Sequence, residues 1–174
     1  VTIEADGDFS YTPKAGDQAL DQFNYTVHTG KSATVSVTKE DMVWYVNNAS
    51  PALPGTGVSS DPFATLQEAR VAATAAASPA EVVFFLYEGN SRTPGSEYDG
   101  NFQLGTNERL QGEGAGLSLA SFPDLVAAGA PPVKTNVTPG GDAIGLGSGS
   151  TLRGVDIKNP TGASIFSDGI NGVW

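Results

Sequence analysis

One short phrase, an apolar residue followed two positions later by glycine, recurs in the second half of this 174-residue sequence. Its copies are Leu110-Gln111-Gly112-Glu113, Leu152-Arg153-Gly154-Val155 and Ile170-Asn171-Gly172-Val173. They start 42 and then 18 residues apart, which is close to two repeats and one repeat of a unit of about 20 residues. This spacing predicts a solenoid, in which each coil stacks on the next and apolar residues of equal phase form ladders in a shared core.

Short strands are predicted throughout the region that carries this phrase. The runs with strand character are MVWYVNN, EVVFFLYEG, NFQLG, ERLQGEG, PVKTNV, DAIGLG, TLRGVDIKN, ASIF and INGVW. The chain has 22 glycines and 11 prolines and only 16% charged residues, a composition that favours short strands joined by tight turns over long helices. We therefore expect an all-β fold.

A single helix is predicted over residues 61–77, DPFATLQEARVAATAAA. Asp61 is the expected N-cap and Pro62 the expected first helical residue, where the missing N–H of proline costs nothing. The apolar residues that share one face at helical spacing are Phe63, Leu66, Ala69 and Ala73. We expect this helix to cover the open end of the first coil, because an uncapped solenoid exposes apolar core and unpaired strand edges.

The first 38 residues have a different pattern. Four short alternating runs, VTIEA, FSYTP, FNYTVHT and ATVSVT, are separated by turn-forming residues, as is typical of antiparallel strands. Four strands are too few for a complete two-sheet sandwich, which takes about seven strands and roughly 100 residues. We therefore expect residues 1–38 to be part of such a domain and the chain to be a piece of a longer protein.

This N-terminal pattern resembles the closing strands of the cadherin-like and immunoglobulin-like repeats of large bacterial surface proteins. The residues that carry the resemblance are Phe9, Tyr11, Pro13, Asp21, Phe23, Tyr25 and Val27. It implies that residues 1–38 are a partial immunoglobulin-like or cadherin-like repeat.

The remainder, residues 39–174, resembles the N-terminal end of a right-handed parallel β-helix, the pectate-lyase-like fold. The motifs that carry this second resemblance are VWYVNN, GTGVSSDPFATLQEA, VVFFLYEG, YDGNFQL, ERLQGEG and STLRGVDI. It implies an N-terminal cap, formed by one α-helix, followed by the first coils of the β-helix.

Composition excludes several kinds of partner and chemistry. Nineteen acidic against nine basic residues give a formal charge of -10 with no basic patch, so no nucleic-acid partner is expected. The absence of cysteine removes disulfides, thiolate metal sites and cysteine nucleophiles. No apolar run approaches the roughly 20 residues that span a bilayer, so no membrane insertion is expected.

Few residues are candidates for catalysis. His28 is the sole histidine and we interpret it as structural, which excludes a Ser-His-Asp arrangement. Arg153 and Asp156 lie on the run TLRGVDI, with Val155 and Ile157 expected inward and Asp156 outward. If Val155 stacks under Val173, the neighbour of Asp156 in the next coil is Trp174, so the paired carboxylates of acid–base chemistry are missing. We therefore assign no catalytic, cofactor-binding or metal-ligating residue.

Two kinds of ligand remain open. Calcium is one, because the N-terminal aspartates supply hard oxygen ligands, although turn aspartates also bond the backbone without any ion. These aspartates are Asp6, Asp8, Asp17 and Asp21. Weak carbohydrate binding is the other, through the rings of Trp44, Tyr45, Tyr98 and Trp174.

Together the two resemblances imply a part of a large bacterial surface or secreted multidomain protein. Its expected role is structural or adhesive, its expected location is extracellular or on the cell surface, and its expected partners are host or surface carbohydrates or proteins. The alternative is the N-terminal part of a carbohydrate-active β-helix enzyme, a polysaccharide lyase or hydrolase, with catalytic residues beyond residue 174. In either case we expect the chain itself to be without enzymatic activity.

Overall fold

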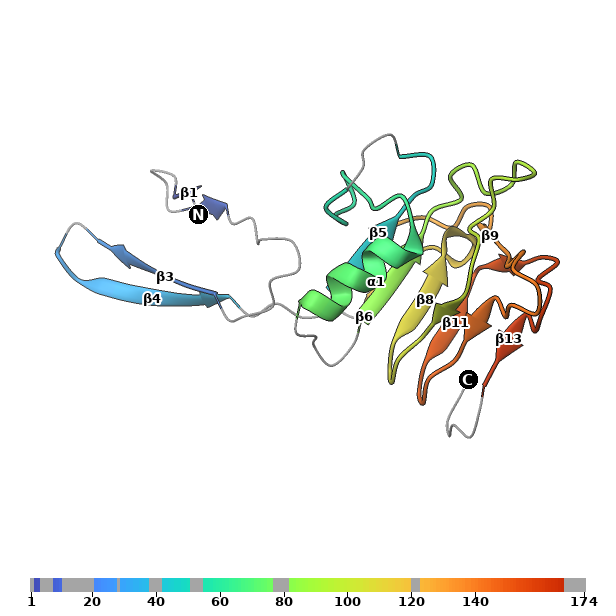
Figure 1. Ribbon diagram of the computed structural model, residues 1–174. Coiled ribbons are helices and arrows are strands. Elements are labelled where there is room, and N and C mark those ends of the chain that lie inside the picture. The colour runs from blue at the N-terminus through green and yellow to red at the C-terminus, as the bar shows by residue number, and fades with distance from the viewer. Residues whose placement is uncertain are drawn as a thin grey trace.

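The computed structural model describes residues 2–3, 8–10, 21–27, 29–37, 42–50, 55–76, 82–119 and 123–167 (Figure 1). Over these residues the protein is mostly β, with one α-helix, α1 (Leu66–Ala75), and one short 3-10 helix, η1 (Glu113–Ala115). The all-β prediction with one helix is therefore confirmed for the described part of the chain.

The N-terminal strands pair in antiparallel fashion, as predicted. β1 (Thr2–Ile3) pairs with β2 (Phe9–Ser10), and β3 (Asp21–Thr26) forms a hairpin with β4 (Ser32–Val37). Tyr25, on β3, is 39% exposed. A hairpin whose aromatic residue remains in solvent has not buried the apolar face that stabilises strands of this kind. Figure 1 shows this hairpin apart from the helix and the parallel sheets.

From Met42 onward the named strands form parallel sheets. The first sheet has the order β11-β8-β6-β5, from β11 (Thr151–Arg153), β8 (Arg109–Gly112), β6 (Val82–Leu86) and β5 (Met42–Val46). The second sheet pairs β12 (Asp156–Ile157) with β9 (Val133–Lys134), and Lys134 in turn forms a parallel bridge with Tyr98. The third sheet has the order β13-β10-β7, from β13 (Ile165–Phe166), β10 (Ile144–Gly145) and β7 (Phe102–Gln103).

The chain passes through these three sheets in the same order each time. From β6 it reaches Tyr98 and then β7; from β8 it reaches β9 and β10; from β11 it reaches β12 and β13. We call each such passage a circuit. Because every pairing between successive circuits is parallel, each circuit lies directly against the previous one.

The recurring glycine phrase marks adjacent circuits and corrects the predicted spacing. Leu152 pairs with Leu110 and Arg153 pairs with Gln111 across the β8–β11 pair. The 42 residues between the two phrases are therefore one circuit, and the prediction of two coils was wrong. The circuit is long because the described residues between β8 and β9, 113–119 and 123–132, lie outside the three sheets. The third copy of the phrase, at Ile170, lies outside the described residues.

Apolar ladders run through the interior along the first sheet. Trp44 pairs with Phe84, Phe84 with Leu110, and Leu110 with Leu152. Phe84 and Leu110 are fully buried, and all four side chains belong to or pack against one large core cluster. Stacking of this kind lets each circuit bury the apolar face of the one before it.

The outer face of the first sheet is covered as well, which explains the continuous apolar run VVFFL in β6. Val83 and Phe85 are fully buried in a second cluster that includes Leu117. Leu117 belongs to the excursion between β8 and β9, where it bridges to Val126. A strand that is buried on both faces needs apolar residues at successive positions rather than at alternate ones.

The helix begins later than predicted. Thr65, not Asp61, is the N-cap, and Thr65 and Glu68 form a capping box in which each side chain accepts a hydrogen bond from the other's backbone N–H. Such a box satisfies two of the free N–H groups of the first turn. Asp61 instead lies in the preceding turn, where its carboxylate accepts from the N–H of Thr56 at 3.0 Å.

The predicted buried face of the helix is confirmed. Leu66, Ala69 and Ala73 are buried in the core cluster, and α1 lies against β5 and β6 (Figure 1). Phe63 is also buried, but it precedes the helix and packs against Trp44 with ring centroids 5.8 Å apart. The helix therefore covers the core at the β5 end of the first sheet. Within the described residues, no helix has the length and apolar character needed to cross a membrane.

Candidate functional site

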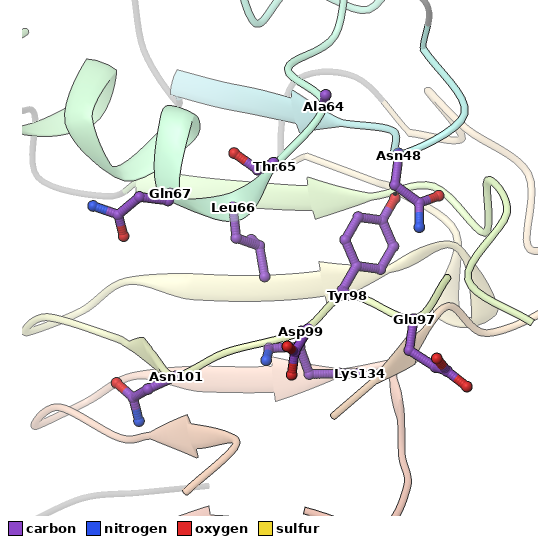
Figure 2. A pocket seen from close by; sticks show the side chains of 10 residues that line it. All are labelled: Asn48, Ala64, Thr65, Leu66, Gln67, Glu97, Tyr98, Asp99, Asn101 and Lys134. Atoms are coloured by element: carbon purple, nitrogen blue, oxygen red, sulfur yellow. Dashed lines mark hydrogen bonds between the residues drawn. The ribbon is translucent and has the colours of Figure 1, made fainter. Parts of the chain in front are cut away.

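A cleft of about 390 Å³ lies between the start of α1 and the segment that precedes β7 (Figure 2). Its lining comes from the turn after β5, the start of α1 with the two residues before it, the segment before β7, and β9. The lining residues are Asn48, Ala64, Thr65, Leu66, Gln67, Glu97, Tyr98, Asp99, Asn101 and Lys134. A concave site with several polar groups is the default place to look for a ligand.

Lys134 is the least expected residue of this cleft. Although it is a lysine it is fully buried, and its Nζ donates hydrogen bonds to the backbone oxygens of Thr135, at 2.7 Å, and of Gly100. Burial lowers the pKa of Lys134 to about 8, and the nearby negative charge of Asp99 offsets part of that effect. In the sequence, Lys134 gives no signal of this role, since it stands in a short strand like any solvent-facing residue.

Tyr98 joins three segments of the chain beneath the cleft. Its hydroxyl accepts a hydrogen bond from the backbone N–H of Asn48 at 3.0 Å and donates to the carbonyl oxygen of Tyr87 at 2.9 Å. The side chain is 5% exposed, and burial raises the pKa of Tyr98 well above its usual value. The hydroxyl therefore acts as a neutral link between the turn after β5 and the end of β6.

The acidic and amide side chains of the cleft hold backbone groups. Asp99 accepts from the N–H of Val137 at 3.0 Å, and Glu97 accepts from the N–H of Gly95 at 2.8 Å. Asn48 donates to Ser96 O and accepts from the N–H of Asn90, both at 2.7 Å. These side chains therefore supply hydrogen-bond partners to backbone groups of the surrounding loops, which have no partners in a helix or sheet.

Arg153 and Asp156, the pair considered for catalysis, lie in different sheets. Gly154, with φ of 65°, bends the chain between them, so that Arg153 ends β11 and Asp156 begins β12. The single strand predicted over TLRGVDI was therefore wrong. Val155 and Ile157 do pack against the core as predicted.

Asp156 has a cation rather than a second acid beside it. Its carboxylate lies 3.1 Å from Nζ of Lys158, and its partner in the neighbouring strand is Val133. Val173 and Trp174, which the prediction places in the next coil, lie outside the described residues.

Two of the four rings proposed for carbohydrate stacking are inside the protein. Trp44 is 4% exposed and Tyr98 is 5% exposed, so neither presents a face to an external sugar, and this part of the prediction was wrong. Trp44 points inward because it alternates with Tyr45 along β5. Tyr45 is half-buried and stacks on Tyr87 with ring centroids 6.1 Å apart. Trp174 lies outside the described residues.

The calcium hypothesis stays a prediction. Asp6, Asp17 and His28 lie outside the described residues, and Asp8 is exposed. The side chain of Asp21 is likewise not described. In the part of the chain that the structure describes, no group of three or more histidine or acidic side chains is arranged to hold a metal ion.

The family comparison supports the N-terminal prediction. Residues 1–39 match the family model of a bacterial Ig domain, which confirms the immunoglobulin-like character of this part. Domains of this family commonly occur in bacterial surface proteins. No curated protein and no solved structure matches the chain. The division of the chain into units 1–38 and 39–174 stays a prediction.

Proposed function

We propose that this chain joins an immunoglobulin-like repeat to a right-handed parallel β-helix in a large bacterial surface or secreted protein, where it serves a structural and adhesive role outside the cell. The observation that carries this proposal is the repeated passage of the chain through three parallel sheets, with Leu110 and Leu152 in register. The match of residues 1–39 to a bacterial Ig domain, just before these sheets begin at Met42, supports the surface location.

The cleft supports a structural role over a catalytic one. Lys134, Tyr98 and Asp99 each make hydrogen bonds to backbone groups, so they join the segment before β7 to its neighbours. A catalytic base needs access to a proton of the substrate, whereas Lys134 is fully buried. The polar residues of the cleft therefore serve mainly to hold the surrounding loops together.

The alternative is the N-terminal part of a carbohydrate-active β-helix enzyme, a polysaccharide lyase or hydrolase. The position of Lys134 favours it: the residue lines the cleft, and burial lowers its pKa to about 8, near the range in which an amine can act as a general base. The separation of Arg153 from Asp156 by the bend at Gly154 weighs against an acid–base site on the circuit formed by β11, β12 and β13.

Surface location is tested on intact cells of the bacterium that encodes the chain. Antibodies raised against the purified chain should label intact cells or the culture fluid, and a mild protease treatment of intact cells should remove cell-bound label. An antibody to a cytoplasmic protein should label only permeabilised cells. Labelling that requires permeabilisation, with none in the culture fluid, would contradict the proposal.

The choice between structural and catalytic roles is tested by turnover. The purified chain should release no product from pectin, polygalacturonate, alginate or β-glucans, with or without millimolar calcium. Turnover that disappears in Lys134→Met, Asp156→Ala or Arg153→Ala would establish the enzyme instead. Turnover that survives all three changes would assign the activity to other residues or to a contaminant.

A further inference from the structure

We draw no further inference here: the strongest candidate, the hollow of about 380 Å³ beside the third sheet that Gln103 and the 46% exposed Phe166 help to line, carries none, because nothing among the described residues shows what covers it.

Discussion

Arg70 and Glu108 form a double hydrogen-bonded ion pair that ties α1 to the turn before β8. Nη1 of Arg70 donates to Oε1 of Glu108 at 2.7 Å, and Nη2 donates to Oε2, also at 2.7 Å. The guanidinium carbon also lies 4.6 Å from the ring centroid of Phe84 and 4.8 Å from that of Phe102. One side chain of the helix therefore contacts residues of the first and third sheets, which places α1 over the core through a charged contact as well as an apolar one.

Replacing Arg70 with methionine should lower the free energy of unfolding by about 1–3 kcal/mol, because Glu108 loses a bidentate partner and both rings lose a cation. Urea denaturation of the two proteins measures the difference. Arg92→Met is the matched control, since Arg92 forms a longer and more exposed ion pair with Glu88, at 3.8 Å, and should lose less than about 1 kcal/mol. Equal losses in the two variants would contradict the role assigned to Arg70.

Replacing Leu66 with aspartate should destabilise the protein by about 3–5 kcal/mol, because the change puts a charge into the contact between α1 and the core. Leu66 is 7% exposed. Val71 on the same helix is 60% exposed, so Val71→Asp should cost less than about 1 kcal/mol. Thermal and urea unfolding of both variants separate the effect of burial from that of helix propensity. A small loss in Leu66→Asp would mean that α1 does not cover the core.

Replacing Gly154 with alanine should lower the free energy of unfolding by about 2–4 kcal/mol, because the added Cβ would both strain the backbone and clash with the neighbouring circuit. The residue has φ of 65°, and an added Cβ would lie 2.6 Å from Gly112 O. Gly95 has φ of 82° but no atom within 4 Å of an added Cβ, so Gly95→Ala should cost only about 1 kcal/mol from backbone strain. Similar losses would show that conformation alone, and not the close approach of two circuits, explains the glycine at 154.

The free energy of unfolding should rise with pH between about pH 8 and pH 10.5, because Lys134 is buried in the folded protein. The pKa of this lysine falls from 10.5 to about 8 on folding, so between these values the unfolded chain binds more protons than the folded chain. The free energy of unfolding therefore increases as pH rises through this window, and the cost of burying the charged amine is present in full below it.

Urea denaturation at pH 7.5 and pH 9.5 measures this effect as a difference between proteins. The Lys134→Met variant should lack the rise that the parent shows. Lys158→Met is the control, because the Lys158 side chain is 50% exposed and its loss should leave the rise in place. A parent protein with no greater rise than Lys134→Met would contradict the buried position of the lysine amine.

Local patterns in the sequence determined most of the secondary structure. Runs such as MVWYV and VVFFL form strands wherever they are placed against a core, because β-branched and aromatic residues pack well on a pleated surface. The spacing of Leu66, Ala69 and Ala73 likewise determined which face of the helix is buried, since three- and four-residue steps return to one side of an α-helix. The alternation in residues 1–38 predicted antiparallel strands, which the structure confirms for the described pairs. The immunoglobulin-like character was implied by the resemblance of this segment to bacterial surface repeats, and the family match at residues 1–39 supports it.

Tertiary structure alone decided how these elements combine. The start of the helix is an exception, because it follows a local signal that the Asp61-Pro62 prediction overlooked: Thr65 and Glu68 form a capping box, and the Thr-x-x-Glu pattern of that box is present in the sequence. The excursion between β8 and β9 turned a 42-residue spacing into a single circuit, and a pattern of phrases cannot reveal how much chain lies outside a sheet. The buried amine of Lys134 donates to the carbonyl oxygen of Gly100, which lies 34 residues earlier in the chain. These two residues meet only because the segment around Tyr98 pairs in parallel with Lys134.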